Sequence, residues 1–247
     1  MVIKMKDCSF LTSNIIAHRG YHNINKNIPE NSIAAFKKAI RYKYIIELDV
    51  HLTKDKRIVV FHDDDLKRMC NIDKKIEDCT YKELLKYNLK GTKYKIPLFE
   101  EVLSLVSGSV PLLIETKVSK FNVVLEKKLS KLLDNYDGLF AVQSFNPLSI
   151  NWFRKHRKNY VRGILSYDFK NYKMPTLTKI ILRTLFLDII LKANFISYKI
   201  SCMPNYFTDK KRRNKILLGW TVRNKKDYLN MKDYCDNLIC ENMDEYL

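Results

Sequence analysis

Two histidines, an arginine and two carboxylates lie in the first third of the chain, each beside an apolar run typical of a buried strand. His18 and Arg19 follow one such run, Glu47 and Asp49 lie within a second, and His62 follows a third. Because Glu47 and Asp49 are two residues apart, their side chains point to the same face of a strand. Two carboxylates side by side at the end of a buried strand repel each other unless a cation lies between them. An arginine can grip phosphate through two hydrogen bonds while an imidazole moves protons, so the pattern predicts a metal-assisted phosphate-ester site.

A third carboxylate extends this predicted site. Glu115 ends the apolar run 112–114, and Lys117 follows two residues later, so the same alternation places the carboxylate and the ammonium together. Glu115 would complete an all-oxygen site suited to Ca²⁺ or Mg²⁺ rather than to zinc, and Lys117 would contact a substrate phosphate. A local Glu–Lys pair on the surface is the alternative interpretation, which the other strands make weaker.

The histidines and one tryptophan have different settings. A histidine after a strand is more often structural than catalytic, but His18 and His62 stand together with Arg19 and the carboxylates, and can serve as base and acid near pH 7. We expect His51, close to a turn, to be solvated. Trp220, near the end of another strand, packs in the core or forms an apolar wall for a small ligand.

Strand-like and helix-like segments alternate along the chain. Strands are predicted at 14–17, 44–50, 58–61, 110–115, 139–143, 161–165, 195–197, 216–222 and 237–240, and helices at 122–133, 147–156 and 176–191, from about Ser32, and after Pro97. Nine strand candidates are one more than a (β/α)8 barrel needs, and the hairpin around residues 54–56 accounts for the extra one. Polar candidates recur at carboxyl ends of strands and no GxGxxG or P-loop motif occurs, so the fold class predicted is an α/β, (β/α)8 TIM barrel rather than a doubly wound sheet. Residues 1–247 would be one domain with an insertion at about 63–97.

Composition narrows the function classes. The 247 residues carry 45 Lys+Arg against 27 Asp+Glu, a net charge of +18, which is mostly a lysine-rich solvated surface and also favours anionic partners. The six cysteines show no CxxC or zinc spacing, which indicates reduced thiols.

The first 14 residues contain no long apolar segment, so we expect a cytoplasmic protein. Residues 180–191 are largely apolar but too short and too charged to span a bilayer, and we expect a well-buried barrel helix, with an interfacial patch near anionic lipid as the alternative.

The ordered set of motifs resembles the glycerophosphodiester phosphodiesterase family over essentially the whole chain. The matching segments are HRG at 18–20, PENS at 29–32, ELDV at 47–50, VFHD at 60–63, IETK at 114–117, QSFNP at 143–147 and WTV at 220–222. Residues 42–44, by contrast, lack the glycine that many members carry before the second strand.

The resemblance implies a phosphodiesterase-type TIM barrel that hydrolyses small glycerophosphodiesters to glycerol 3-phosphate and an alcohol. It implies that a divalent metal, Ca²⁺ or Mg²⁺, binds Glu47, Asp49 and Glu115. His18 and His62 would be the acid–base pair, and the substrate would contact Arg19, Lys117 and Trp220. Attack by water and attack by the glycerol 2-hydroxyl both remain open.

Two other hypotheses compete with this one. A lysophospholipase-D-like enzyme would use the same barrel, with the basic surface and residues 180–191 in peripheral contact with an anionic membrane. A non-catalytic barrel that binds anionic ligands needs no acid–base set, and no nucleic-acid-binding motif is present, so no nucleic-acid partner is expected. The sequence fixes no oligomeric state.

Overall fold

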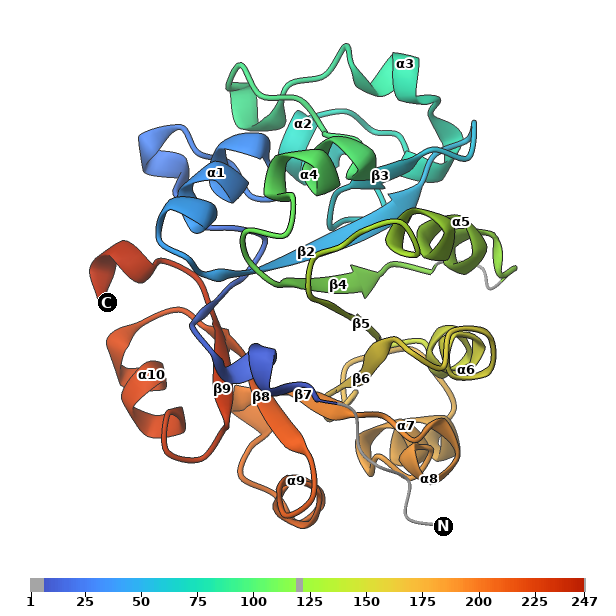
Figure 1. The fold of residues 1–247 in the computed structure, drawn as a ribbon, viewed down its shortest axis with the longest axis vertical. Coiled ribbons are helices and arrows are strands. Elements are labelled where there is room, and N and C mark those ends of the chain that lie inside the picture. The colour runs from blue at the N-terminus through green and yellow to red at the C-terminus, as the bar shows by residue number, and fades with distance from the viewer. Residues whose placement is uncertain (1–6, 119–121, 247) are drawn as a thin grey trace. The chain divides into compact units, whose positions relative to one another are not determined.

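The computed structural model describes residues 7–118 and 122–246. Its strands are β1 (Ile16–Ala17), β2 (Ile45–Leu52), β3 (Ile58–Val60), β4 (Leu112–Thr116), β5 (Phe140–Ser144), β6 (Val161–Ser166), β7 (Phe195–Lys199), β8 (Ile216–Val222) and β9 (Asn237–Cys240). The α-helices are α1 (Ile33–Arg41), α2 (Lys67–Cys70), α3 (Tyr81–Leu84), α4 (Phe99–Val106), α5 (Val124–Leu133), α6 (Pro147–His156), α7 (Thr176–Arg183), α8 (Asp188–Leu191), α9 (Tyr206–Arg212) and α10 (Lys225–Met231) (Figure 1). Short 3-10 helices cover Ser9–Thr12, Ile24–Lys26, Ile76–Asp78, Leu89–Gly91, Ile200–Cys202 and Met243–Glu245.

The chain forms two compact units. Residues 16–140 make one unit, and the described residues of 1–15 and 141–247 make the other. In the first unit, β1 and β4 pair in parallel with β2, and β3 pairs with it in antiparallel fashion. β3, the antiparallel partner of β2 in this hairpin, is the extra strand that the sequence predicted.

The first unit has a fully buried central strand. Every residue of β2 from Ile45 to His51 is buried, which agrees with its almost unbroken apolar pattern. Helix α1 lies beside this strand, and α4 packs against α1 and β3 (Figure 1). The Ser32 hydroxyl caps α1 by accepting the Ala35 N–H at 3.2 Å, which confirms the predicted start of this helix.

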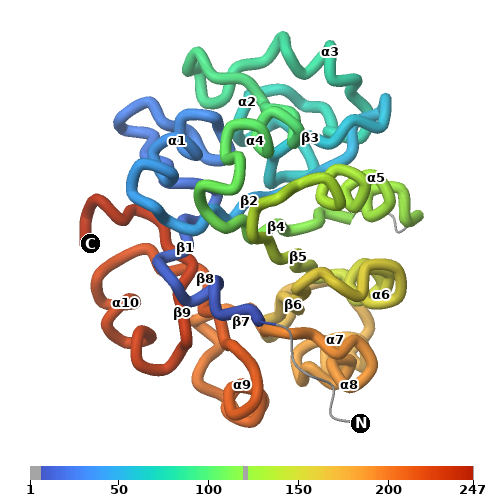
Figure 2. The backbone as a smooth tube through the Cα atoms, in the orientation of Figure 1, coloured from blue at the N-terminus to red at the C-terminus, as the bar shows by residue number. Residues whose placement is uncertain are grey.

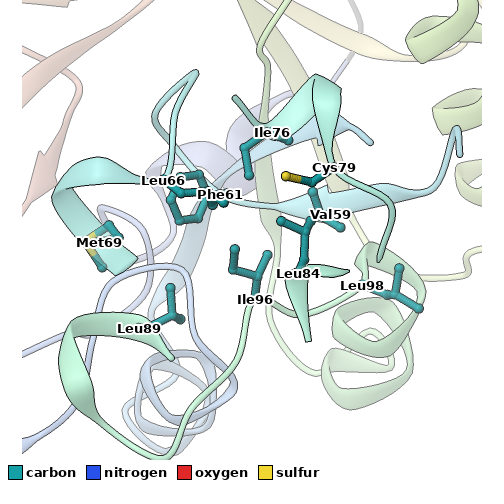
Figure 3. Close-up of a cluster of buried hydrophobic side chains, with 10 residues drawn as sticks. All are labelled: Val59, Phe61, Leu66, Met69, Ile76, Cys79, Leu84, Leu89, Ile96 and Leu98. Carbon is teal, nitrogen blue, oxygen red and sulfur yellow. The ribbon is translucent and has the colours of Figure 1, made fainter. Parts of the chain in front are cut away.

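The segment between β3 and α4 has a small hydrophobic core of its own. It contains α2, α3 and two 3-10 helices, Ile76–Asp78 and Leu89–Gly91. Its buried side chains converge between the turns that carry them (Figure 3): Val59, Phe61, Leu66, Met69, Ile76, Cys79, Leu84, Leu89, Ile96 and Leu98. The Thr80 hydroxyl and the Glu83 carboxylate form a reciprocal cap at the start of α3. The segment is therefore ordered by packing and capping rather than by long elements.

The second unit carries five parallel strands. β5, β6, β7, β8 and β9 pair in chain order, and α6 follows β5 with Asn146 as its cap and Pro147 at its first position. Figure 2 follows the backbone through this unit, where α6 packs beside α8. Eight parallel strands that alternate with helices make the fold a (β/α)8 TIM barrel, as predicted from the sequence. All six cysteines are free thiols, as expected.

The prediction for residues 176–191 was wrong in two respects. The structure has two helices, α7 and α8, separated at Leu185, whose φ of +56° is left-handed. This turn lets both Leu185 and Leu191 be buried in the interior of the unit. One straight helix over 176–191 would not bring both side chains to the same buried side. α7 also contains no buried residue, so it is not the well-buried helix that we expected.

Candidate active site

Three carboxylates meet on the neighbouring strands β2 and β4, near the carboxyl end of β4. Asp49 and Glu115 are register partners across the two parallel strands, and Glu47 precedes Asp49 on the same face. One oxygen from each of the three lies within 4.8 Å of the others. All three side chains are buried, with 1%, 0% and 6% of Glu47, Asp49 and Glu115 exposed. The sequence prediction that these residues come together is correct.

The electrostatics of this cluster favour a bound cation. Burial, together with repulsion from Asp49 and Glu115, raises the pKa of Glu47 well above its usual value. Burial also raises the pKa of Glu115, against the opposing effect of Lys117. Asp49 Oδ1 accepts no hydrogen bond of good geometry, although it is completely buried. Grouped carboxylate oxygens of this kind fit a divalent cation such as Ca²⁺ or Mg²⁺.

Lys117 lies against two of the carboxylates. Its Nζ is 3.1 Å from Asp49 Oδ1 and 2.5 Å from Glu115 Oε1. Burial alone would lower the pKa of this ammonium, but Asp49 and Glu115 outweigh burial and raise it. Asp49 shows the converse: burial would raise its pKa, but Lys117 and the other nearby cations hold it well below the usual value. Lys117 therefore keeps its positive charge beside an ionised carboxylate.

Arg19 is held in place by its backbone as well as by its side chain. Its φ of +56° is left-handed, and its N–H donates to Glu47 Oε2 at 3.0 Å. The guanidinium donates from Nη1 to Glu30 Oε1 at 2.7 Å, and its Nε lies 3.5 Å from Asp49 Oδ2. The guanidinium of Arg19 thus lies beside the carboxylate cluster, as expected, and Glu30 holds its Nη1 end in place.

The two candidate histidines border the cluster. His18 is buried, and its Nε2 lies 3.9 Å from Glu47 Oε2. His62 is more exposed, and its Nδ1 donates to Asp63 Oδ1 at 2.6 Å. This hydrogen bond fixes the tautomer, so the other ring nitrogen, Nε2, can accept a proton. The structure therefore brings both histidines to the first unit's strand ends together with the carboxylates.

Sequence reasoning missed four residues that support the site. Asn31 Nδ2 donates to Asp49 Oδ2 at 2.9 Å, and Glu30 binds both Arg19 and Arg68. Arg68 in turn donates to both oxygens of Asp63. Glu30, Asn31 and Asp63 belong to the motif segments 29–32 and 60–63, so their position beside the candidate residues is the signal that the sequence offers. Their partners are up to 38 residues away, which spacing alone does not show.

The expectation that His51 is solvated was wrong. Its side chain is buried because β2 extends to Leu52 and pairs with β3 at this point, where His51 faces Val59. Its Nε2 donates to the His62 carbonyl oxygen at 3.1 Å. His51 therefore holds the backbone of a candidate catalytic residue rather than facing solvent.

Trp220 belongs to the second unit, on β8. Its ring makes edge-to-face contacts with Phe145, at 5.5 Å between centroids, and with Tyr167, at 6.2 Å. Phe145 and Tyr167 directly follow β5 and β6, so the three rings gather at the carboxyl ends of three strands. Both interpretations of Trp220 given above, packing and an apolar wall, agree with this aromatic cluster.

The fold and these side chains define a class of protein. A (β/α)8 barrel that carries grouped buried carboxylates, an adjacent lysine and arginine, and a carboxylate-held histidine is equipped for metal-assisted hydrolysis of a phosphoester. The chain belongs to the glycerophosphoryl diester phosphodiesterase family, whose model matches residues 18–245.

Known proteins resemble all or part of this chain. YhdW of Bacillus subtilis (strain 168), provisionally named a glycerophosphodiester phosphodiesterase, is 32% identical over 86% of this chain and 87% of its own. The human lysophospholipase D GDPD1 is 36% identical, over 49% of this chain and 41% of its own. The structure of an Oleispira antarctica phosphodiesterase in complex with its product sn-glycerol-3-phosphate has the same fold. It has a TM-score of 0.78 at 21% identity and covers 92% of each chain.

Proposed function

We propose that this protein hydrolyses glycerophosphodiesters to glycerol 3-phosphate and an alcohol. The observation that carries the proposal is the buried cluster of Glu47, Asp49 and Glu115 with Lys117 against it. Family membership supports the same reaction class. A small soluble diester is the substrate that the proposal assigns.

The three carboxylates are the proposed ligands of a divalent cation, Ca²⁺ or Mg²⁺. The bound cation would supply Lewis-acid stabilisation of the negative charge that develops on a phosphoryl oxygen. Arg19 and Lys117 add fixed positive charge on the same face, so both would contact the phosphate. Asn31 holds Asp49 in place through its amide.

The two histidines would divide the proton transfers. His62 is the proposed general base, because its Nδ1–H is committed to Asp63 and its Nε2 is free to take a proton from the attacking hydroxyl. His18, beside Glu47, is then the proposed general acid that protonates the departing alkoxide. Trp220 is the proposed apolar wall for the carbon atoms of the glycerol moiety.

Release of glycerol 3-phosphate from glycerophosphocholine and glycerophosphoethanolamine tests this proposal. We expect release that EDTA abolishes and that Mg²⁺ or Ca²⁺ restores. Glu115→Gln should lose metal binding by calorimetry, and His18→Ala should lose turnover while binding metal normally. Asp233→Asn, at an exposed carboxylate outside the cluster, is the matched control. Turnover that persists in EDTA and in His18→Ala would refute the mechanism.

A second candidate is a lysophospholipase-D-like activity. It is favoured by the exposed apolar side chains of α7 and α8 and by the partial similarity to human lysophospholipase D. Release of choline from lysophosphatidylcholine, compared with glycerophosphocholine at equal concentration, separates the two candidates. Faster turnover of the lysophospholipid would favour the second one.

Four further expectations from the sequence remain predictions. These are the cytoplasmic location, the absence of a nucleic-acid partner, peripheral contact with an anionic membrane, and a single domain with an insertion at about 63–97. Among the described residues, no helix is both long enough and apolar enough to cross a membrane.

A further inference from the structure

Several large apolar side chains are exposed on α7, α8 and the turn between them. We call this surface the α7–α8 face. Its five members are between 49% and 68% exposed: Leu177, Ile180, Phe186, Ile189 and Ile190. Single exposed apolar residues are ordinary, but five within 14 successive positions are a concentration that points to an interaction site.

The unit's own contacts hold this face outward. Asp188 is buried, where it pairs with Lys211 and Lys215 and accepts the Ala193 N–H. Leu185 and Leu191 are buried beside it. These three inward residues fix the rotation of α8 and of the turn, so Phe186, Ile189 and Ile190 cannot turn inward together.

Two further hydrogen bonds hold α7. The Ser166 hydroxyl donates to the Leu182 carbonyl oxygen at 2.9 Å, and the Tyr198 hydroxyl donates to the Arg183 carbonyl oxygen at 3.2 Å. Both donors lie on strands of the same unit, β6 and β7. The exposed side chains of α7 are therefore presented by a helix that is fixed to the sheet.

The charges in the segment that carries the α7–α8 face are mostly positive. Cations flank it at five positions, of which all but the half-buried Lys179 are exposed: Lys170, Lys173, Lys179, Arg183 and Lys192. Between positions 167 and 192 the acidic residues are Asp168 and Asp188 alone. Asp168 lies beside Lys170, at 3.7 Å, and Asp188 is buried in its lysine pairs. The outer surface thus combines apolar side chains with an excess of positive charge.

We propose that the α7–α8 face docks the protein on an anionic lipid bilayer, with Phe186, Ile189 and their apolar neighbours inserted among the lipids. Apolar side chains bordered by lysine and arginine match the acyl chains and acidic headgroups of such a surface. A second copy of this chain fits the face less well, because pairing two such faces would bring their cationic borders together. A nucleic acid fits less well because its phosphates would leave the apolar side chains without a partner. Docking on lipid does not depend on the proposed catalytic activity.

Co-sedimentation with unilamellar vesicles tests the docking surface. The vesicles are pure phosphatidylcholine or a mixture of phosphatidylcholine with phosphatidylglycerol. We expect the wild-type protein to bind the mixed vesicles at least about tenfold more tightly than the zwitterionic ones. The double variant Phe186→Ser/Ile189→Ser should lose at least about tenfold in affinity for the mixed vesicles.

A control and a second variant make the result decisive. Tyr206→Ser, which removes a comparably exposed side chain from α9, should bind vesicles like the wild type. Lys173→Glu/Lys192→Glu leaves the apolar side chains intact and should weaken binding only to anionic vesicles. Circular dichroism and turnover of soluble glycerophosphocholine should be unchanged in all variants, which separates failure to dock from failure to fold or to catalyse.

Equal binding of the wild type and both double variants would overturn the proposal. If the wild type binds vesicles equally well with and without phosphatidylglycerol, the proposed role of the cationic residues is overturned. Sedimentation equilibrium without lipid provides a further test. If the wild type forms a dimer that only Phe186→Ser/Ile189→Ser abolishes, and the wild type does not bind vesicles, the occupant is a second copy of the chain and the proposal is overturned.

Discussion

The His62–Asp63 pair is the residue-scale feature on which the proposed proton transfer depends. Asp63 Oδ1 accepts from His62 Nδ1 at 2.6 Å, and Arg68 holds both oxygens of the carboxylate. Asp63→Asn keeps an oxygen acceptor but removes the charge that stabilises a protonated imidazole. We expect kcat to fall by about tenfold to a hundredfold while KM changes by less than about twofold. Steady-state kinetics with glycerophosphocholine measure both constants.

The control for this prediction is Asp65→Asn, which alters an exposed carboxylate two residues away. It should leave kcat and KM unchanged. A rise in KM with normal kcat in Asp63→Asn would contradict the positioning role and indicate a contribution to substrate binding instead.

Glu30 makes the free energy of unfolding depend on pH. Burial alone would raise the pKa of this carboxyl, but Arg68 and Arg19 outweigh it and lower the pKa from 4.5 to about 2. A carboxyl whose folded pKa is depressed stabilises the fold above its unfolded pKa and loses that contribution as the pH falls toward the folded value. We expect Glu30→Gln to lower the free energy of unfolding at pH 7 by at most about 3 kcal/mol, with the difference from wild type vanishing between about pH 4.5 and pH 2.

Urea unfolding of both proteins at matched pH values measures this difference, because acid effects common to the two proteins cancel. A difference that stays constant from pH 7 to pH 2 would show that Glu30 acts through packing and not through its charge.

The sequence predicted the grouping of the carboxylates better than the residues that hold them. Glu47 and Asp49 were predictable since alternation along a buried strand fixes which side chains share a face. Asn31 and Asp63 were not, because their roles depend on hydrogen bonds to side chains whose approach is set by the fold. His51 was misjudged for the same reason, since pairing with β3 decides its burial.

At the scale of elements, the end of α1 contains a backbone conformation that its residue does not favour. Lys43 lies just beyond the helix with a left-handed φ of +57°, and its N–H donates to the Ile40 carbonyl oxygen at 2.9 Å. Residues 42–44 are where the family resemblance leads us to expect a glycine, which adopts a left-handed φ without strain. Lys43→Gly removes the steric cost of the Cβ atom and should raise the free energy of unfolding by up to about 1 kcal/mol.

Lys37→Gly is the matched control, because Lys37 is exposed within the same helix with ordinary helical geometry. It should lower the free energy of unfolding by about 1 kcal/mol. Thermal or urea unfolding measures both changes. If both glycines destabilise the protein equally, the side chain of Lys43 makes contacts that outweigh its backbone strain.

Element types were predictable from periodicity, but breaks and exposure were not. Segment 147–156 became α6 with unchanged bounds, because Asn146 and Pro147 are local start signals. Segment 176–191 split into α7 and α8 because the buried Asp188, anchored by Lys211 and Lys215, decides which side faces inward. Those lysines are more than 20 residues away, so no local pattern could indicate the break.

At the scale of the whole molecule, the fold class followed from the alternation of apolar strands with helices, which requires no knowledge of individual contacts. The net charge of +18 is equally a property of the whole chain, and acts on substrates before they reach the site. Steering by such a charge depends on the net charge of the substrate and weakens as salt shortens the screening length, about 10 Å at 0.1 M.

Two substrates with the same reacting diester separate this effect from chemistry. Glycerophosphoglycerol carries one net negative charge, whereas the choline of glycerophosphocholine cancels the charge of its phosphate. Between about 20 mM and about 200 mM NaCl, we expect kcat/KM to fall roughly threefold or more for the first substrate and less than about twofold for the second, with kcat unchanged for both. Initial rates at a saturating concentration of divalent metal measure this dependence. Equal slopes would mean that salt acts on metal binding or on the fold, because steering by the positive surface must distinguish an anion from a zwitterion.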